Sequence, residues 1–160
     1  KVQNLPNIEV IPDLPECRSA MFHTLNKVTK IPKTPKLEHL ILNTMKILTF
    51  IPPLTSLKTI TAKLLFIDII PTFPNCNSLI LESLPKLTTI SDQPKLKVLS
   101  LSLCPILSNM PISIFSNLTS LILKPPIYPV FKEFIKKNFE LIKSLENYYV
   151  LSKIVSVAKK

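Results

Sequence analysis

The sequence predicts an α/β solenoid, in which about six short coils of chain stack on one another and each contributes one β-strand to a shared parallel sheet. Two observations lead to this prediction. An Ile-Pro pair recurs about every 20 residues, and an apolar ladder with the spacing LxxLxL follows each recurrence. A third observation concerns the turns, because the 160 residues contain 16 Pro and no Gly. A coil this short cannot bury its apolar side alone, so neighbouring coils have to stack.

The Ile-Pro recurrence sets the length of each coil. The recurring positions are Ile11, Ile31, Ile51, Ile70, Ile90 and Met110, and in most coils a proline follows directly. The steps between them are 20, 20, 19, 20 and 20 residues. A second proline follows three residues after the first in most coils, at Pro15, Pro35, Pro74 and Pro94, whereas Pro53 and Leu54 disturb this position in the third coil. Without Gly, tight turns have to be made by Pro, Asn and Asp, so these prolines are expected to mark turns.

The apolar ladders are the predicted strands. The last two apolar residues of each ladder are two positions apart, which is the strand period, so both side chains point to the same side. The ladders are residues 17–22, 37–42, 57–62, 76–81, 96–101 and 118–123, and the last arrives two residues late relative to Met110. After the strand, a 20-residue coil has little chain left for its opposite side. We therefore expect extended or 3₁₀ segments there instead of full α-helices.

The periodicity changes near the end of the chain, which divides it into a solenoid at residues 1–127 and a helical cap at residues 128–160. Apolar residues at helical spacing form one face there, at Phe131, Phe134, Leu141, Leu145 and Tyr148. Other apolar residues, such as Phe139 and Leu151, lie off that face and indicate either a second helix or a contact patch for a partner. The sequence begins in the middle of a coil, from which we expect that this chain is the C-terminal part of a longer parent protein.

The LxxLxL ladders with a double-proline lead-in resemble the leucine-rich-repeat family, over residues 5 to about 124. They look most like the short repeats of bacterial effector proteins, and the Lys-, Ile- and Asn-rich composition is also similar to repeat proteins of amoebae and their giant viruses. The resemblance implies a right-handed superhelix with a parallel sheet on its concave face. One position departs from the family, which usually has Asn at the ninth residue of the ladder to satisfy backbone groups in the turn. That position is apolar here, at Leu25, Met45, Leu65, Leu84 and Cys104.

The resemblance also implies that a partner binds on the concave face, at residues that alternate with the buried ones. Two columns of such residues form the predicted partner-binding site. The first column begins at Ser19, and its site residues are His39, Thr59, Ser78, Val98 and Ser120. The second column consists of Met21, Ile41, Thr61, Ile80, Ser100 and Ile122. The second column is apolar for an exposed surface. This indicates either a protein-contact strip or the ordinary preference of Ile and Thr for strands.

The sequence offers no arrangement typical of catalysis, and we expect no catalytic, cofactor or metal site. His23 and His39 are sixteen residues apart and so fall in different columns. A chain without Gly cannot form a Gly-rich phosphate loop. Cys104 lacks a predictable His partner, so it is not expected to act as a nucleophile.

Cysteine usage and charge limit the remaining classes. Cys17, Cys76 and Cys104 are widely spaced and include no CxxC pair, so a zinc site is not expected. Free buried thiols favour a reducing, intracellular and cytoplasmic location. The net charge of +10 comes mostly from scattered lysines, without the exposed aromatics of a nucleic-acid surface. The most apolar window, residues 57–73, contains charged residues, so no membrane span is expected.

Three functions follow from these observations. The leading hypothesis is a protein–protein interaction module that binds a protein partner on its sheet. The alternative is the substrate-recognition part of a larger enzyme, such as a ubiquitin ligase, whose catalytic domain is absent from this chain; related bacterial effectors join such repeats to a catalytic domain. A third hypothesis is that the lysine-rich tail binds a polyanion.

Overall fold

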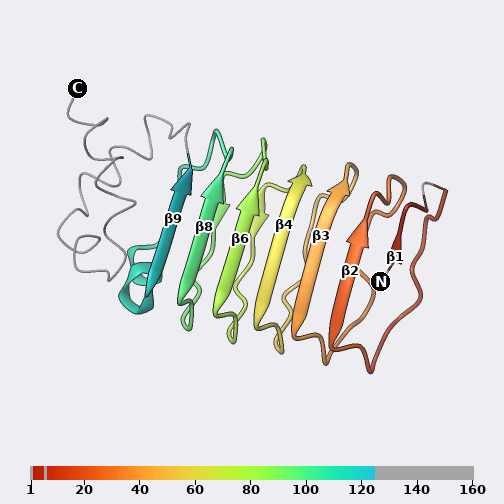
Figure 1. The fold of residues 1–160 in the computed structure, drawn as a ribbon, viewed down its shortest axis with the longest axis horizontal. Helices are drawn as coiled ribbons and strands as arrows, with labels where there is room; N and C mark the ends of the chain where they lie inside the picture. Colours follow the sequence, from red (N-terminus) through yellow and green to blue (C-terminus); the bar gives the residue numbers. More distant parts are fainter. Residues whose placement is uncertain (1, 6, 125–160) are drawn as a thin grey trace.

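The apolar ladders all form strands of one parallel sheet, as seen in the computed structural model, which describes residues 2–5 and 7–124 (Figure 1). The chain winds into a β-solenoid in which each coil adds a strand beside the previous one. The strands of this sheet, in spatial order, are β1 (Val2–Gln3), β2 (Ser19–His23), β3 (His39–Met45), β4 (Thr59–Leu65), β6 (Ser78–Glu82), β8 (Val98–Ser102) and β9 (Ser120–Lys124). The predicted parallel sheet of stacked coils is therefore confirmed, and β1 adds a short seventh strand.

The sequence period explains why these segments are strands. Along β6 and β8, buried and half-buried residues alternate, so one face of each strand meets the core while the other faces outward. Neighbouring strands pair without slippage. Leu40, for example, lies beside Ile60, and Ile60 lies beside Leu79. A shift of one residue would turn the whole apolar set toward solvent, so the buried ladder fixes the register.

The core is a stack of equivalent apolar positions contributed by every coil. The coil that starts at Leu37 buries seven side chains, which are Leu37, Leu40, Leu42, Met45, Leu48, Ile51 and Leu54. The corresponding residues of the next coil, from Leu57 to Phe73, are also buried. The apolar residue at the ninth ladder position, such as Met45 or Leu84, belongs to this core. The turn therefore packs on apolar side chains at the position where the leucine-rich-repeat family, which the sequence resembles, usually has Asn.

In the coils that have a second proline, this proline lies in a tight turn that leads into the strand. Pro35 follows Thr34, whose carbonyl oxygen accepts a hydrogen bond from the N–H of Leu37 at 3.1 Å. This is the position of a β-turn that the fixed φ of proline favours. In the third coil the same bond runs from Leu57 N–H to Leu54 O at 3.3 Å, with Thr55 in the place of proline. The irregular prolines of that coil therefore leave the turn intact.

The side of the solenoid opposite the main sheet contains extended chain and one 3₁₀ helix, as the coil length predicts. A second, two-stranded parallel sheet pairs β5 (Ile69–Ile70) with β7 (Thr89–Ile90). The 3₁₀ helix η1 (Ile112–Asn117) occupies the last coil, where the two extra residues before the final ladder provide the chain for it. It is the only helix among residues 2–5 and 7–124, and none there is long and apolar enough to cross a membrane. The predicted helical cap at residues 128–160 lies outside the described residues.

The turns at the carboxyl ends of the strands correct one expectation. Among residues 2–5 and 7–124, six residues at equivalent positions of successive coils lie in the left-handed region, with φ between 52° and 57°: Asn4, Thr24, Thr44, Leu64, Ser83 and Leu103. We expected Pro, Asn and Asp to supply the tight turns, but Asn holds this position only once. Thr and Leu are disfavoured there, by roughly 1–2 kcal/mol for a left-handed L-residue. The packing of the stacked coils therefore imposes this conformation on residues that do not prefer it.

We predict that Thr44→Asn stabilises the protein by about 0.5–1 kcal/mol, because Asn tolerates the left-handed region better than a β-branched residue. The change removes only a 3.0 Å hydrogen bond from Thr44 Oγ1 to Asn43 Oδ1. Equilibrium urea unfolding would measure the difference. Thr72→Asn is the matched control, because Thr72 is exposed and has no left-handed backbone. Equal effects of the two substitutions would show that the left-handed turn carries no strain.

Candidate functional site

The outward face of the main sheet brings the predicted partner-binding residues together. In the first column, strand pairing aligns Ser19, His39, Thr59, Ser78, Val98 and Ser120. In the second column it aligns Met21, Ile41, Thr61, Ile80, Ser100 and Ile122. The eleven residues predicted as the site are these two columns without Ser19, and they share one surface, which we call the sheet face. Whether a partner binds there remains a prediction.

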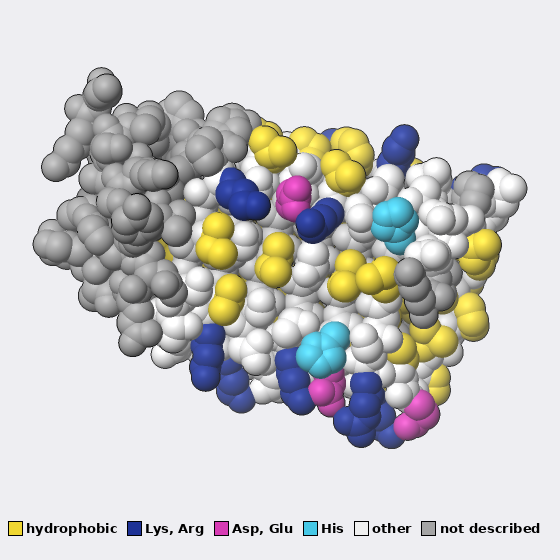
Figure 2. Space-filling view, in the orientation of Figure 1, with side chains coloured by type: hydrophobic (Ala, Val, Ile, Leu, Met, Phe, Trp, Pro, Cys, Tyr) yellow, Lys and Arg dark blue, Asp and Glu magenta, His cyan; other side chains and the backbone are white. Residues whose placement is uncertain are grey.

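The apolar part of the sheet face is interrupted. Ile41, Ile80 and Ile122 are half-buried, while Thr61 and Ser100 separate them along the column. Figure 2 shows separate groups of apolar atoms over the sheet with polar atoms between them. The face therefore offers a partner several small apolar contacts within a polar surface.

Polar contacts on the sheet face cross from strand to strand. His39 Nδ1 lies 2.9 Å from Thr59 Oγ1, between β3 and β4. Near the strand ends, Lys63 Nζ lies 2.7 Å from a carboxylate oxygen of Glu82. This hydrogen bond from Lys63 is the main reason that the pKa of Glu82 is lowered, and the charge of Lys124 adds to it. The lowered pKa keeps Glu82 ionised, so its negative charge offsets the positive charge of Lys63.

The edge formed by the amino ends of the strands carries ion pairs between coils. Glu38 accepts a hydrogen bond from Arg18 at 2.9 Å and one from Lys58 at 2.6 Å. The hydrogen bond from Lys58 is the largest cause of the lowered pKa of Glu38. Arg18 and Lys58 are more than half exposed, and ion pairs with exposed partners contribute little to stability. They join residues that occupy equivalent positions in successive coils. Sequence reasoning did not anticipate these ion pairs.

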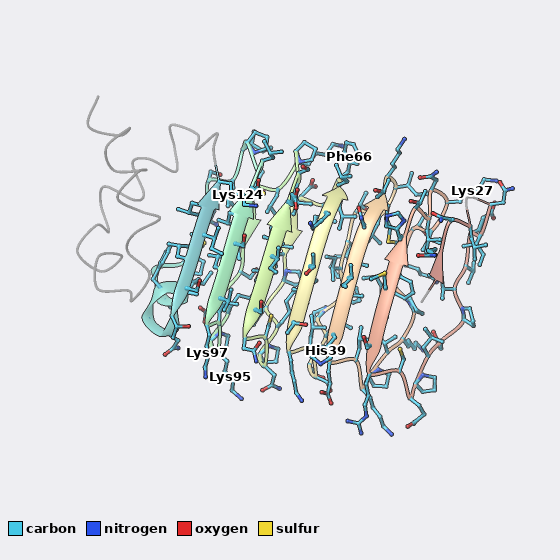
Figure 3. The ribbon with its side chains drawn as sticks, in the orientation of Figure 1. Lys27, His39, Phe66, Lys95, Lys97 and Lys124 are labelled. Atoms are coloured by element: carbon cyan, nitrogen blue, oxygen red, sulfur yellow. The ribbon has the colours of Figure 1, made fainter. Side chains whose placement is uncertain are left out.

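The edge at the carboxyl ends of the strands contains a groove of about 500 Å³, which we call the carboxyl-edge groove. Its lining residues are Thr44, Lys46, Leu64, Phe66, Ser83, Pro85, Leu103 and Pro105. Figure 3 shows Phe66 at the end of β4, across the sheet from His39. Sequence reasoning missed this groove. The available signal was the recurrence of Lys46, Phe66, Pro85 and Pro105 at one position of the repeat, just after each strand.

The three cysteines are free thiols, as predicted, but only Cys76 is buried, while Cys17 and Cys104 are half-buried. The Cys76 thiol donates a hydrogen bond to the carbonyl oxygen of Ser78 at 3.3 Å. Burial raises the pKa of Cys76 to about 11. Burial also raises the pKa of Cys104. Both thiols therefore stay protonated near neutral pH, which disfavours nucleophilic chemistry.

We predict that Cys76 makes stability fall in alkaline solution. A thiol whose folded pKa lies above its unfolded pKa contributes stability that is complete below the unfolded value, here 9.0, and is lost as pH rises toward about 11. Urea unfolding of the natural chain and of Cys76→Ala between pH 7 and about 11 measures this contribution. The stability of the natural chain should fall more steeply than that of Cys76→Ala, because lysine titration is common to both. Parallel curves would contradict the raised pKa.

The two histidines stay in different columns, His23 on β2 and His39 on β3. His23 Nδ1 lies 2.9 Å from Thr24 Oγ1, while His39 contacts Thr59. Within residues 2–5 and 7–124, no three His, Cys, Asp or Glu side chains gather closely enough to hold a metal ion. The described surface has exposed or half-buried polar and apolar side chains on the sheet face and in the carboxyl-edge groove.

The chain was also compared with known proteins. No protein-family model, no curated protein and no solved structure matched it.

Proposed function

We propose that this chain is a protein–protein interaction module of the leucine-rich-repeat type, whose sheet face binds a protein partner. The single observation that supports this is the strand register, which aligns the outward residues into continuous columns over six strands. A rigid sheet holds its side chains at fixed spacing of about 4.8 Å from strand to strand. A partner can therefore be recognised with little loss of side-chain freedom.

The composition of the face favours a protein over other ligands. Half-buried Ile41, Ile80 and Ile122 supply apolar anchors, and Ser and Thr around them can form hydrogen bonds. The ion pair of Lys63 with Glu82 gives the strand ends both signs of charge. Apolar anchors within a polar rim are typical of protein interfaces.

The proposal is tested by introducing three carboxylates into the second column. We expect the combined change Ile41→Asp, Ile80→Asp and Ile122→Asp to weaken partner retention at least about tenfold, because each carboxylate would have to be desolvated at the contact. The immobilised chain is exposed to cell lysate, and retained proteins are quantified by mass spectrometry. Circular dichroism checks that each variant is folded.

The matched control adds the same charge elsewhere. Thr29→Asp, Thr49→Asp and Ser108→Asp lie at exposed positions outside the main sheet. A specific partner should be retained by the natural chain and by this control, and lost from the sheet-face variant. Retention of the same proteins by both variants would refute binding on the sheet face. The recognition part of a larger enzyme remains an alternative that reading the neighbouring gene sequence would test.

A further inference from the structure

The carboxyl-edge groove is built from equivalent positions of four consecutive coils. One wall comes from the left-handed residues, such as Leu64 and Leu103, and the other from residues two positions later, such as Phe66 and Pro105. Coils stack about 4.8 Å apart, so four coils give a groove about 14 Å long. The groove is therefore a regular product of the repeat.

Exposed apolar side chains lie next to one another in the groove instead of being scattered over the surface. Leu64, Phe66 and Leu103 are 51%, 39% and 44% exposed. In Figure 2 apolar atoms gather along the upper edge of the molecule, where Figure 3 places Phe66. Phe66 lies there because it stands two positions after the left-handed residue Leu64, as the other residues of this wall do in their coils. Contiguous apolar surface of this kind marks a contact site more often than scattered exposure does.

The charge that lines the groove is positive, and the nearby carboxylate of Glu82 is already paired with Lys63. Lys46 is the only charged residue that lines it, and no carboxylate does. Lys86 Nζ lies 5.9 Å from the ring centroid of Phe66. Within the part of the chain that the structure describes, neither lysine forms an ion pair. A complementary occupant therefore carries carboxylates next to its apolar residues.

The backbone on the strand side of the groove is already hydrogen-bonded, which disfavours a strand-like occupant there. The N–H of Ser83 donates to Ser102 O at 2.9 Å. Thr44 and Leu64 lie within β3 and β4, whose pairing continues to the last residue of each strand, Met45 beside Leu65. These strand-side groups are therefore not available to pair with an extended peptide. A helix satisfies its own backbone groups and needs only side-chain contacts.

We propose that the carboxyl-edge groove binds a short amphipathic helix of a partner protein. Such a helix places apolar side chains against Leu64, Phe66 and Leu103, and carboxylates beside Lys46 and Lys86. A groove about 14 Å long accommodates about nine helical residues, at a rise of about 1.5 Å each. This surface is distinct from the sheet face, so the two proposals can fail separately.

The test uses a display library of helical peptides of about 16 residues, selected against the full chain. Enriched peptides should have apolar residues at helical spacing flanked by Asp and Glu. Phe66→Asp should weaken their binding at least about tenfold. Lys46→Glu should also weaken it, and a peptide with Lys in place of the facing Glu should restore it. Lys97→Glu is the matched control, because Lys97 is exposed at the opposite edge and its side chain forms no ion pair in the described residues (Figure 3).

The outcomes are decisive in both directions. Failure to enrich such peptides, or binding that survives Phe66→Asp, would overturn the proposal. So would an acidic preference that Lys46→Glu does not change. Sedimentation at increasing concentration tests whether a second copy of this chain occupies the groove. A dimer that Phe66→Asp abolishes would also overturn the proposal. The sheet-face variant should bind the peptides normally, which separates this proposal from the proposed function.

Discussion

Phe73→Ala is expected to destabilise the protein by about 3–5 kcal/mol, the range for truncating a fully buried Phe. Phe73 is 0% exposed and lies in the core that the coils share. Its ring fills the inward position that Leu54 fills in the preceding coil. Because the coils stack rigidly, the cavity cannot close without moving several strands. Equilibrium urea unfolding measures the change.

Phe50→Ala is the matched control for this prediction. Phe50 is 59% exposed, so its truncation should change the free energy of unfolding by no more than about 0.5 kcal/mol. A Phe73→Ala effect as small as that of Phe50→Ala would mean that residue 73 does not occupy a packed interior.

Gln93→Leu is expected to cost about 2–4 kcal/mol, although Leu would fit the apolar repeat better. Gln93 is 1% exposed and lies at an inward position. Its Oε1 accepts a hydrogen bond from Phe73 N–H at 3.1 Å, and its Nε2 donates to Pro71 O at 2.8 Å. Leu would leave these backbone groups without partners, at roughly 1–3 kcal/mol each, partly offset by its greater apolarity.

Hydrogen exchange gives the Gln93 prediction a second readout, because the Phe73 amide should exchange faster in Gln93→Leu. Asn75→Leu is the control. Asn75 Nδ2 also donates to a neighbouring coil, to Thr55 O at 2.8 Å, but Asn75 is exposed and water can replace the bond. If Gln93→Leu were as mild as Asn75→Leu, the buried amide would not be holding two coils together.

The strands and their register could be predicted because the same spacing of apolar residues recurs in every coil. Each ladder has the same spacing, so pairing Leu40 with Ile60 follows from aligning the coils. The columns of the sheet face follow from the same alignment. The two extra residues before Leu118 also had a readable consequence, since extra chain had to form a structure on the opposite side, and η1 is that structure.

Other features depended on departures from the repeat, whose effects are three-dimensional. The position of Phe66 in the repeat was visible, but not that this position would form one wall of a groove. The polar Gln93 stood at an apolar position without indicating which backbone groups it would satisfy. The left-handed conformation of Thr44 and Leu64 opposes their local preference, so only the stacked coils explain it.

The central claim is that successive coils lie in parallel with equivalent residues side by side. Backbone nuclear Overhauser effects between neighbouring strands test it most directly. The account predicts contacts that join Ile41 to Thr61 and Ile80 to Ser100, in the pattern of a parallel sheet. Contacts from these residues to other positions, or an antiparallel pattern, would contradict it.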